Sequence, residues 1–334
     1  APAPPPCPPP SPPRRRCSCG TAVGQTANAP IRHSAAADLA REVIGPHARI
    51  VEQVPLGFGN SNWRVRAGDV DLVLKIGPRA STDKWAAGER GRRLAAAAGV
   101  PVPEIHDVTT TDHHVVRTYR WIDGAVSPRD LDQAGRRRFG RDLGAAVGAL
   151  HELTHTGFSS RIGGSALVFD HWSDYCVHRL GQITVRAGRS GNPPARVVSR
   201  VVDQVERVVH AASGSARAVT CHRDLHVDNL LAGPDGHLRA ILDWDMPEAW
   251  DEAGEWFKLD WMLFPAIPEA QVPFEAAYRD LRGELPDWDR RVRLVHLIET
   301  LNVLANSGSR SDADLTSRAA DHLDVLLNGQ DDPG

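Results

Sequence analysis

Lysine is scarce in this 334-residue chain, with three lysines against 36 arginines. The skew is typical of a GC-rich coding background, but it draws attention to the surroundings of Lys75, Lys84 and Lys258. Long apolar runs are also lacking: no run approaches the ~20 residues that cross a bilayer. The formal net charge of −3 argues against a general nucleic-acid binder. We therefore expect neither a membrane nor a nucleic acid as a partner.

Cysteine is sparse as well, and its five positions form no disulfide framework. A reducing, cytoplasmic location is the simplest expectation. Nine of the first thirteen residues are proline, and Arg14–Arg16 follow them. Such a composition buries no core, and it lacks the apolar segment of a signal peptide. We expect residues 1–30 to be a disordered Pro/Arg-rich extension outside the fold.

The next part of the chain favours strands. Short β-branched runs are separated by Gly or Asp turns, and a helix is predicted between the third and fourth runs. The predicted strands are Ile50–Pro55, Trp63–Ala67, Val70–Ile76 and Val115–Trp121, and the predicted helix runs from Thr82 to Ala98.

From residue 124 the pattern becomes helical. Apolar residues recur along one helix face at Phe139, Leu143, Ala146, Val147, Leu150 and Leu153. Two further helices are predicted to close the chain. The last begins at the capping box Ser311-x-x-Asp314 and stops at Gly329. Strands around one helix, followed mostly by helices, indicate an α+β fold.

The most informative motif lies in residues 221–245. It supplies His222-x-Asp224 and then Asn229, and Asp243 follows at the end of an apolar run. Phosphoryl transfer from a nucleotide uses these groups. One carboxylate orients and deprotonates a hydroxyl, while an Asn and a second Asp hold Mg²⁺ on the phosphates.

At these residues the chain resembles the kinase-like small-molecule phosphotransferases, and within them the aminoglycoside phosphotransferase family. The resemblance implies a bilobal protein-kinase-like fold. A small antiparallel-sheet N-lobe would span residues 38–123 and bind the nucleotide, and a larger, mostly helical C-lobe would span 124–330. It also implies Asp224 as the catalytic base, with His222 bracing the catalytic loop. Asn229 and Asp243 would hold Mg²⁺.

The resemblance also implies which residues would bind the nucleotide. The turn at Gly57, Gly59 and Asn62 would bring backbone N–H groups to the phosphates. Lys75, in an apolar strand, would pair with ATP or GTP phosphates and with Glu89, the carboxylate of the following helix beyond its first turn. The stretch around Arg120 and Ile122 would be the hinge that binds the base through its backbone.

Departures from protein kinases point to a small-molecule acceptor. Position 226 is His, Asp243-Trp244-Asp245 replaces Asp-Phe-Gly, and 97 residues separate Gly124 from His222. Residues 241–290 hold 13 acidic against 4 basic residues, which suits a cationic acceptor such as an amine-bearing antibiotic. The candidate acceptor-contacting residues are His226, Asp245, Asp251 and Glu252.

Several alternatives stay open. The cluster from His222 to Asp228 also has ligand types of a dinuclear metal hydrolase. That function would leave Lys75 and Glu89 without a role. A metabolic kinase acting on an amino alcohol, sugar or homoserine-like substrate has the same motif. A nucleotide-binding pseudokinase is the alternative without catalysis.

Overall fold

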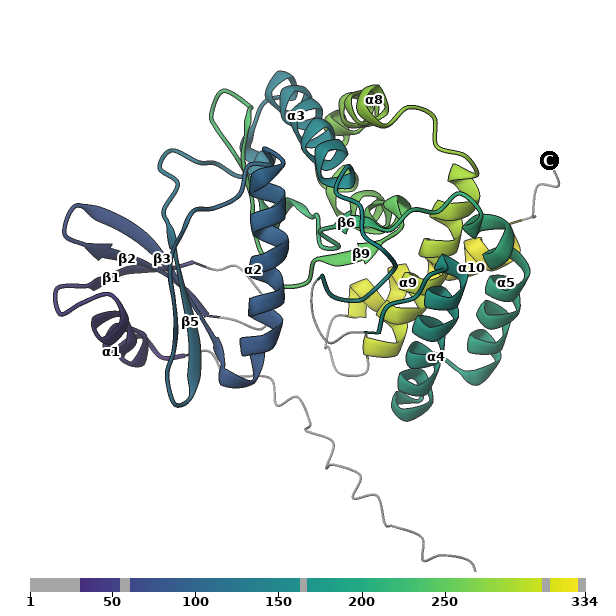
Figure 1. Cartoon of the computed structure of the whole chain (residues 1–334), viewed down its shortest axis with the longest axis horizontal. Helices are drawn as coiled ribbons and strands as arrows, with labels where there is room; N and C mark the ends of the chain where they lie inside the picture. Colours follow the sequence, from purple (N-terminus) through teal and green to yellow (C-terminus); the bar gives the residue numbers. More distant parts are fainter. Residues whose placement is uncertain (1–30, 55–60, 163–166, 308–312, 330–334) are drawn as a thin grey trace, which may run out of the picture.

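The computed structural model describes residues 31–54, 61–162, 167–307 and 313–329. They form two lobes, with a β-sheet on one side and a group of helices on the other (Figure 1). Helix α2 (Thr82–Ala97) runs between the sheet and the helical lobe. The predicted bilobal α+β class, with a small antiparallel-sheet N-lobe and a mostly helical C-lobe, is confirmed.

The N-lobe sheet has five antiparallel strands in the order β1-β2-β3-β5-β4. Side chains alternate along β2, so that Trp63 and Val65 point into a core shared with helix α1 (His33–Val43). The strands are β1 (Arg49–Val54), β2 (Ser61–Ala67), β3 (Val70–Pro78), β4 (Ile105–Thr110) and β5 (His114–Arg120).

Two N-lobe elements were not predicted. Strand β4 lies at the sheet edge with most side chains exposed, so its sequence Ile-His-Asp-Val-Thr-Thr has no apolar alternation to detect. Helix α1 has no side-chain cap at its start, which removes the usual signal for a helix beginning. The four strands and the helix that were predicted are all present.

The C-lobe is built on long helices around two apolar cores. Helix α3 carries the predicted apolar stripe, whose Phe139, Leu143 and Leu150 are buried, and packs along α8. The other long helices share a second core that contains Val205 and Leu301. The helices are α3 (Gln133–His151), α4 (Trp172–Ser190), α5 (Ala195–Ser213), α6 (Trp256–Lys258), α7 (Phe264–Ala266), α8 (Gln271–Arg282), α9 (Trp288–Ser307) and α10 (Ala313–Asn328).

Helix α10 ends before Gly329, as predicted, while Ser311 of the expected cap lies outside the described residues. Among the helices that the structure describes, none has the length and apolar character of a membrane span.

Short strands and turns position the loops that carry the residues of the 221–245 motif. Two small antiparallel ladders, β6 with β9 and β7 with β8, hold the loops at 222–229 and 242–247 between them. Loops fixed at both ends by ladders present side chains with little freedom. The short elements are β6 (Val219–Cys221), β7 (Leu230–Ala232), β8 (Leu238–Ile241), β9 (Glu248–Trp250), the 3₁₀ turns η1 (Arg79–Ser81), η2 (Pro128–Asp130), η3 (Val227–Asn229), η4 (Glu252–Glu255) and η6 (Pro268–Ala270), and the π-helical turn η5 (Leu259–Leu263).

Candidate active site

The catalytic loop starts with an unusual backbone conformation directly after β6. Arg223 has φ +71°, in the left-handed region, and its N–H donates to both carboxylate oxygens of the buried Glu255, at 3.0 and 3.1 Å. The left-handed region is costly for a residue other than glycine unless its surroundings hold it. The bond to Glu255 supplies this constraint and turns the next side chain, Asp224, out of the loop.

The Asp224 carboxylate is held from two sides. Its Oδ1 lies 2.9 Å from the ammonium of Lys258, and its Oδ2 accepts a hydrogen bond from the Asn229 amide at 3.1 Å. His226 Nε2 lies 3.5 Å from the same Oδ2. Burial alone would raise the pKa of Asp224, but the nearby His226 ring and the Lys258 charge outweigh it and hold the pKa well below its usual range. The carboxylate is therefore ionised and oriented.

His222 supports this loop from inside. Its Nε2–H donates to the Leu242 carbonyl at 2.8 Å, while Nδ1 lies 3.3 Å from the Asp224 backbone nitrogen and accepts from it. The ring also meets Trp244 edge to face, with centroids 4.7 Å apart. Burial lowers the pKa of His222, so the ring is neutral. These contacts give the ring a bracing position between the two loops.

Asn229 and Asp243 provide oxygen donors on the same cavity. The Asn229 NH₂ group donates to the Asp224 carbonyl at 2.9 Å and to its carboxylate, which leaves the amide oxygen for another partner. Asp243 has φ +56° and a side chain that is 31% exposed. Both residues line an interlobe pocket. Amide and carboxylate oxygens are the donors that Mg²⁺ prefers, so this pair fits a magnesium ion.

The expected ion pair between Lys75 and Glu89 is wrong. The Lys75 ammonium, on β3, lies 2.8 Å from Asp243 Oδ1 and 3.0 Å from Asp245 Oδ1. Glu89 instead binds Arg92 and Arg93 of its own helix, at 2.8 and 2.7 Å. Burial opposes the Lys75 charge, but the two carboxylates outweigh burial and raise its pKa.

Close packing against the C-lobe restricts two neighbouring positions of α2. A Cβ built on Gly88 of α2 would lie 1.9 Å from the Trp244 carbonyl oxygen, and one on Gly91 would lie 2.4 Å from the Pro247 ring. The face of α2 that meets the C-lobe therefore accepts only glycine at these two positions. The neighbouring Glu89 binds Arg92 and Arg93 of its own helix.

The pocket brings together most of the residues predicted for the nucleotide. Asn62, Lys75, Arg120 and Ile122 line it, together with Asn229 and Asp243. The Arg120 guanidinium lies 3.1 Å from Glu104 in an exposed pair. Gly57 and Gly59 lie outside the described residues. Apolar walls complete the pocket, from Val54, Val73, Tyr119, Trp121, Leu231 and Leu242.

The prediction that Asp251 and Glu252 contact the acceptor is wrong. Asp251 and Glu252 are buried and bind the guanidinium of Arg291, at 2.6 and 3.0 Å. Glu252 also binds Arg217 at 2.7 Å and contacts Arg282. Buried carboxylates need such partners, and none of their charge remains for an acceptor. Asp245 is likewise buried against Lys75, so of the four candidate residues only His226 contacts Asp224.

The structure adds a residue that sequence reasoning missed. Lys258, at the end of α6, contacts Asp224, and the π-helical turn η5 follows it directly. Such turns are common at functional sites. One signal was available, because Lys258 is one of three lysines among 36 arginines. The other two lysines lie near Asp245, another acid of the motif. The Lys75 ammonium is 3.0 Å and the Lys84 ammonium 3.9 Å from its carboxylate.

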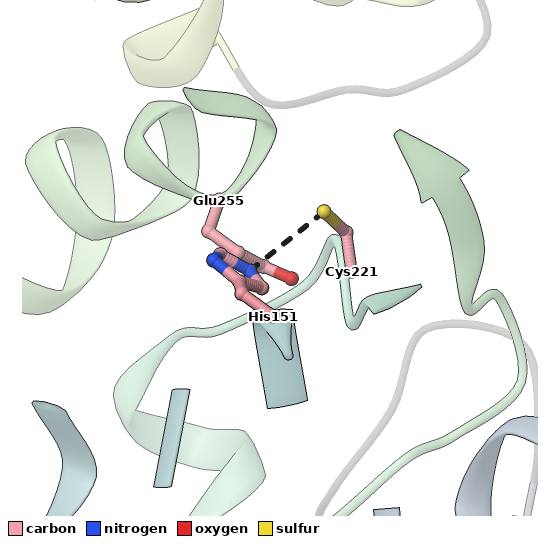
Figure 2. Close-up of side chains that lie close together, drawn as sticks. All are labelled: His151, Cys221 and Glu255. Atoms are coloured by element: carbon pink, nitrogen blue, oxygen red, sulfur yellow. Dashed lines mark hydrogen bonds between the residues drawn. The ribbon is translucent and has the colours of Figure 1, made fainter. Parts of the chain in front are cut away.

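Behind the loop, His151, Cys221 and Glu255 place potential metal-ligand atoms within 4.8 Å of one another (Figure 2). His151 Nδ1 bonds the Tyr278 hydroxyl at 2.8 Å, and its Nε2 lies 3.8 Å from Cys221 Sγ. Burial lowers the pKa of His151 to about 3 and raises that of the Cys221 thiol. Both groups are therefore neutral and already bonded, which favours packing under the catalytic loop over metal binding.

One family model and several solved structures match the chain. Residues 50–249 match the model of a family described as the phosphotransferase enzyme family. No curated protein matched the chain.

Three solved structures illustrate the similarity of fold. The apo form of a thermostable mutant of aminoglycoside phosphotransferase APH(4)-Ia aligns with TM-score 0.69 and 18% identity, over 88% of this chain and 100% of that one. A ternary complex of a mutant of that enzyme with ADP and hygromycin B aligns with TM-score 0.67 and 18% identity, over 87% and 96%. A putative fructosamine-3-kinase from Thermobifida fusca YX-ER1 aligns with TM-score 0.65 and 18% identity, over 89% and 99%.

Proposed function

Because the chain belongs to the phosphotransferase enzyme family, we propose that it moves the γ-phosphate of ATP or GTP to a hydroxyl group of a small molecule. One observation carries this proposal. The ionised carboxylate of Asp224 lies in the same interlobe region as Lys75, Asn229 and Asp243, which line one pocket. Phosphoryl transfer needs these groups together: an oriented carboxylate, a cation for phosphate, and oxygen ligands for a metal.

Asp224 acts on the acceptor in the proposed reaction. Its carboxylate accepts the hydrogen bond of the acceptor hydroxyl and aligns that oxygen with the γ-phosphorus. The new O–P bond forms while the bond from the γ-phosphorus to the bridging oxygen breaks. The electron pair leaves with the nucleoside diphosphate, and the hydroxyl proton passes to Asp224. Lys258 and Asn229 keep the carboxylate in one orientation during this step.

Lys75, Asn229 and Asp243 act on the nucleotide. The Lys75 ammonium binds phosphate oxygens, and the oxygens of Asn229 and Asp243 would hold Mg²⁺. The bound ion would neutralise the charge of the β- and γ-phosphates. The base would lie between the apolar walls of the pocket and bond to backbone near Trp121 and Ile122. Backbone recognition accommodates adenine or guanine, so both nucleotides remain in the proposal.

Two acceptor classes deserve testing. The likeness to an enzyme crystallised with hygromycin B supports an aminoglycoside or another amine-bearing antibiotic, and with it a role in resistance. The likeness to a putative fructosamine-3-kinase supports a metabolic sugar or amino-alcohol acceptor. The burial of Asp251 and Glu252 against Arg291 removes the charge argument for a cationic acceptor, and this applies to amine-bearing antibiotics and amino alcohols alike.

A phosphorylation screen tests the proposal. The full chain is incubated with Mg²⁺ and ATP or GTP, together with aminoglycosides, amino alcohols, sugars and fructosamines. Each product is identified by its mass. We expect one class to gain a phosphate, and Asp224→Asn to abolish the gain. Transfer that persists in this variant contradicts the role of Asp224. A wild-type protein that binds no nucleotide with Mg²⁺ overturns the proposed function itself.

A further inference from the structure

Asp245 is a buried carboxylate beside three cations, of which Lys75 and Arg117 are buried and Lys84 is partly exposed. The Asp245 side chain is 5% exposed, and it lies 3.0 Å from Lys75, 3.7 Å from Arg117 and 3.9 Å from Lys84. Lys75 and Arg117 face each other across β3 and β5, whereas Asp245 comes from the C-lobe loop after Asp243. A single C-lobe carboxylate is thus in contact with three cations of the N-lobe.

Helix α2 contributes the Trp85 ring beside Lys75 and Arg117. The Lys75 ammonium lies 5.3 Å from the Trp85 ring centroid, and the Arg117 guanidinium lies 4.9 Å from it. Arg117 also donates to the Trp85 carbonyl at 2.6 Å. Since Trp85 is buried and Gly88 packs directly on the Trp244 carbonyl, a carboxylate from either position is ruled out.

We propose that Asp245 is the positioning residue for Lys75, in place of a carboxylate from helix α2. The proposal rests on the proposed function, in which Lys75 binds nucleotide phosphates. Asp243 and Asp245 share one ammonium in the structure. If Asp243 holds a metal, Asp245 would still hold the Lys75 ammonium near the phosphates. A lysine held by Asp243 alone would have to share that one carboxylate with the metal.

The arrangement also couples Lys75 to the joint between the lobes. Asp245 belongs to the segment on which α2 rests through Gly88 and Gly91. A separation of the lobes would therefore remove the anchor of Lys75 and the support of α2 together. The orientation of Lys75 then depends on contact between the lobes and not on a carboxylate of α2.

Calorimetric titration with a non-hydrolysable ATP analogue and Mg²⁺ tests this inference without an acceptor. We expect Asp245→Asn to weaken binding about tenfold or more, because it uncouples a buried ion pair. Glu89→Gln is the matched control, a carboxylate-to-amide change on α2, and should stay within about twofold of wild type. Asp245→Glu keeps the charge but displaces it, and should cause an intermediate loss.

A double-mutant cycle shows whether Asp245 acts through Lys75. In a Lys75→Met background, adding Asp245→Asn should cost less than about twofold in affinity, because the residue to be positioned is gone. An equal loss in both backgrounds, or unchanged binding in Asp245→Asn alone, overturns the inference. A larger loss in Glu89→Gln than in Asp245→Asn also overturns it.

Melting temperatures separate folding from binding in these variants. If Asp245→Asn does not fold, the comparison of Asp245→Glu with Glu89→Gln decides, and equal affinities of those two variants contradict the inference. A wild-type protein without nucleotide binding overturns the proposed function and this inference together. Wild-type binding with an unaffected Asp245→Asn variant overturns this inference alone.

Discussion

Asp243 and Asp251 lie eight residues apart in the chain, yet their surroundings differ completely. Asp243 is 31% exposed and lines the interlobe pocket, with one lysine on one of its oxygens. Asp251 is fully buried, and both its oxygens accept from Arg291, at 3.1 and 2.6 Å. The first carboxylate has capacity for a ligand, and the second serves the stability of the C-lobe. A count of acidic residues in the sequence cannot separate these two regions.

The largest effect is expected from the pocket side. Asp224→Asn should lower kcat by roughly 10²- to 10⁴-fold, because the acceptor hydroxyl loses its base. Nucleotide affinity should remain near that of wild type, since Asp224 does not contact the phosphates in the proposed reaction. Steady-state kinetics with an acceptor from the screen, and calorimetry with nucleotide, measure the two quantities. Turnover above a few per cent of wild type contradicts the assignment.

Arg291→Met should produce the largest effect on the buried side. It leaves Asp251 and Glu252 without their shared guanidinium, and breaking such a pair costs about 3–5 kcal/mol of unfolding free energy. Urea unfolding measures the loss. Arg239→Met is the control, because its pair with Asp235 is half exposed and should contribute little. Equal losses of unfolding free energy in the two variants would mean that the buried ion pairs contribute no more to stability than an exposed one.

A matched pair of substitutions sharpens the contrast. Asp243→Asn should abolish the effect of Mg²⁺ on nucleotide binding and leave the melting temperature nearly unchanged. Asp251→Asn should do the reverse, lowering the melting temperature while Mg²⁺-dependent binding persists in the folded protein. Calorimetry with and without Mg²⁺ and thermal unfolding measure both. If Asp251→Asn also removes the Mg²⁺ effect, the two regions are not separate.

Lys258 should have a smaller effect on the reaction. Lys258→Gln removes the cation on Asp224 Oδ1 and should lower kcat about tenfold, with nucleotide affinity unchanged. Lys258→Arg should recover part of the loss because it keeps the charge. Steady-state kinetics of the two variants check this. A loss confined to nucleotide affinity would contradict this role, because it would mean that Lys258 acts on the nucleotide and not on Asp224.

The smallest effect concerns pH and the loop anchor. Burial raises the pKa of Glu255 to about 7 from 4.5. The folded state thus binds this proton more tightly, so the contribution to stability is present below pH ~4.5 and is lost as pH rises through ~7. Glu255→Gln should therefore show a weaker decline of unfolding free energy from pH 5 to 8 than wild type. Parallel urea titrations across this range detect it, and identical slopes would contradict the raised pKa.

Local patterns in the sequence predicted much of the fold. Strands β1, β2, β3 and β5 and helix α2 follow from periodicity and turn residues. The edge strand β4 was not predicted, because an exposed strand needs no apolar alternation. The grouping of Asp224 and Asn229 was predictable for a similar reason: they lie five residues apart on one short loop, which brings them together.

The ion pairs could not be predicted in this way. Lys75 and Asp243 are 168 residues apart, and Asp224, in the loop after β6, contacts Lys258 on the separate helix α6. Which carboxylate faces Lys75 depends on the closeness of α2 to Trp244, and no local pattern records that distance. Likewise, the charges of Asp251 and Glu252 look like surface charges until Arg291, on α9, is placed against them.

The sequence by itself determined the class of fold and the kind of chemistry and predicted the catalytic loop, because these depend on periodicity and on residues close together in the chain. Only the tertiary structure decided the partner of Lys75, the contact of Lys258 with Asp224 and the burial of the acidic residues. Those outcomes depend on which surfaces the lobes and helices bury against one another. Burial decides whether a charge is paired and unavailable, as at Asp251, or open to a ligand, as at Asp243.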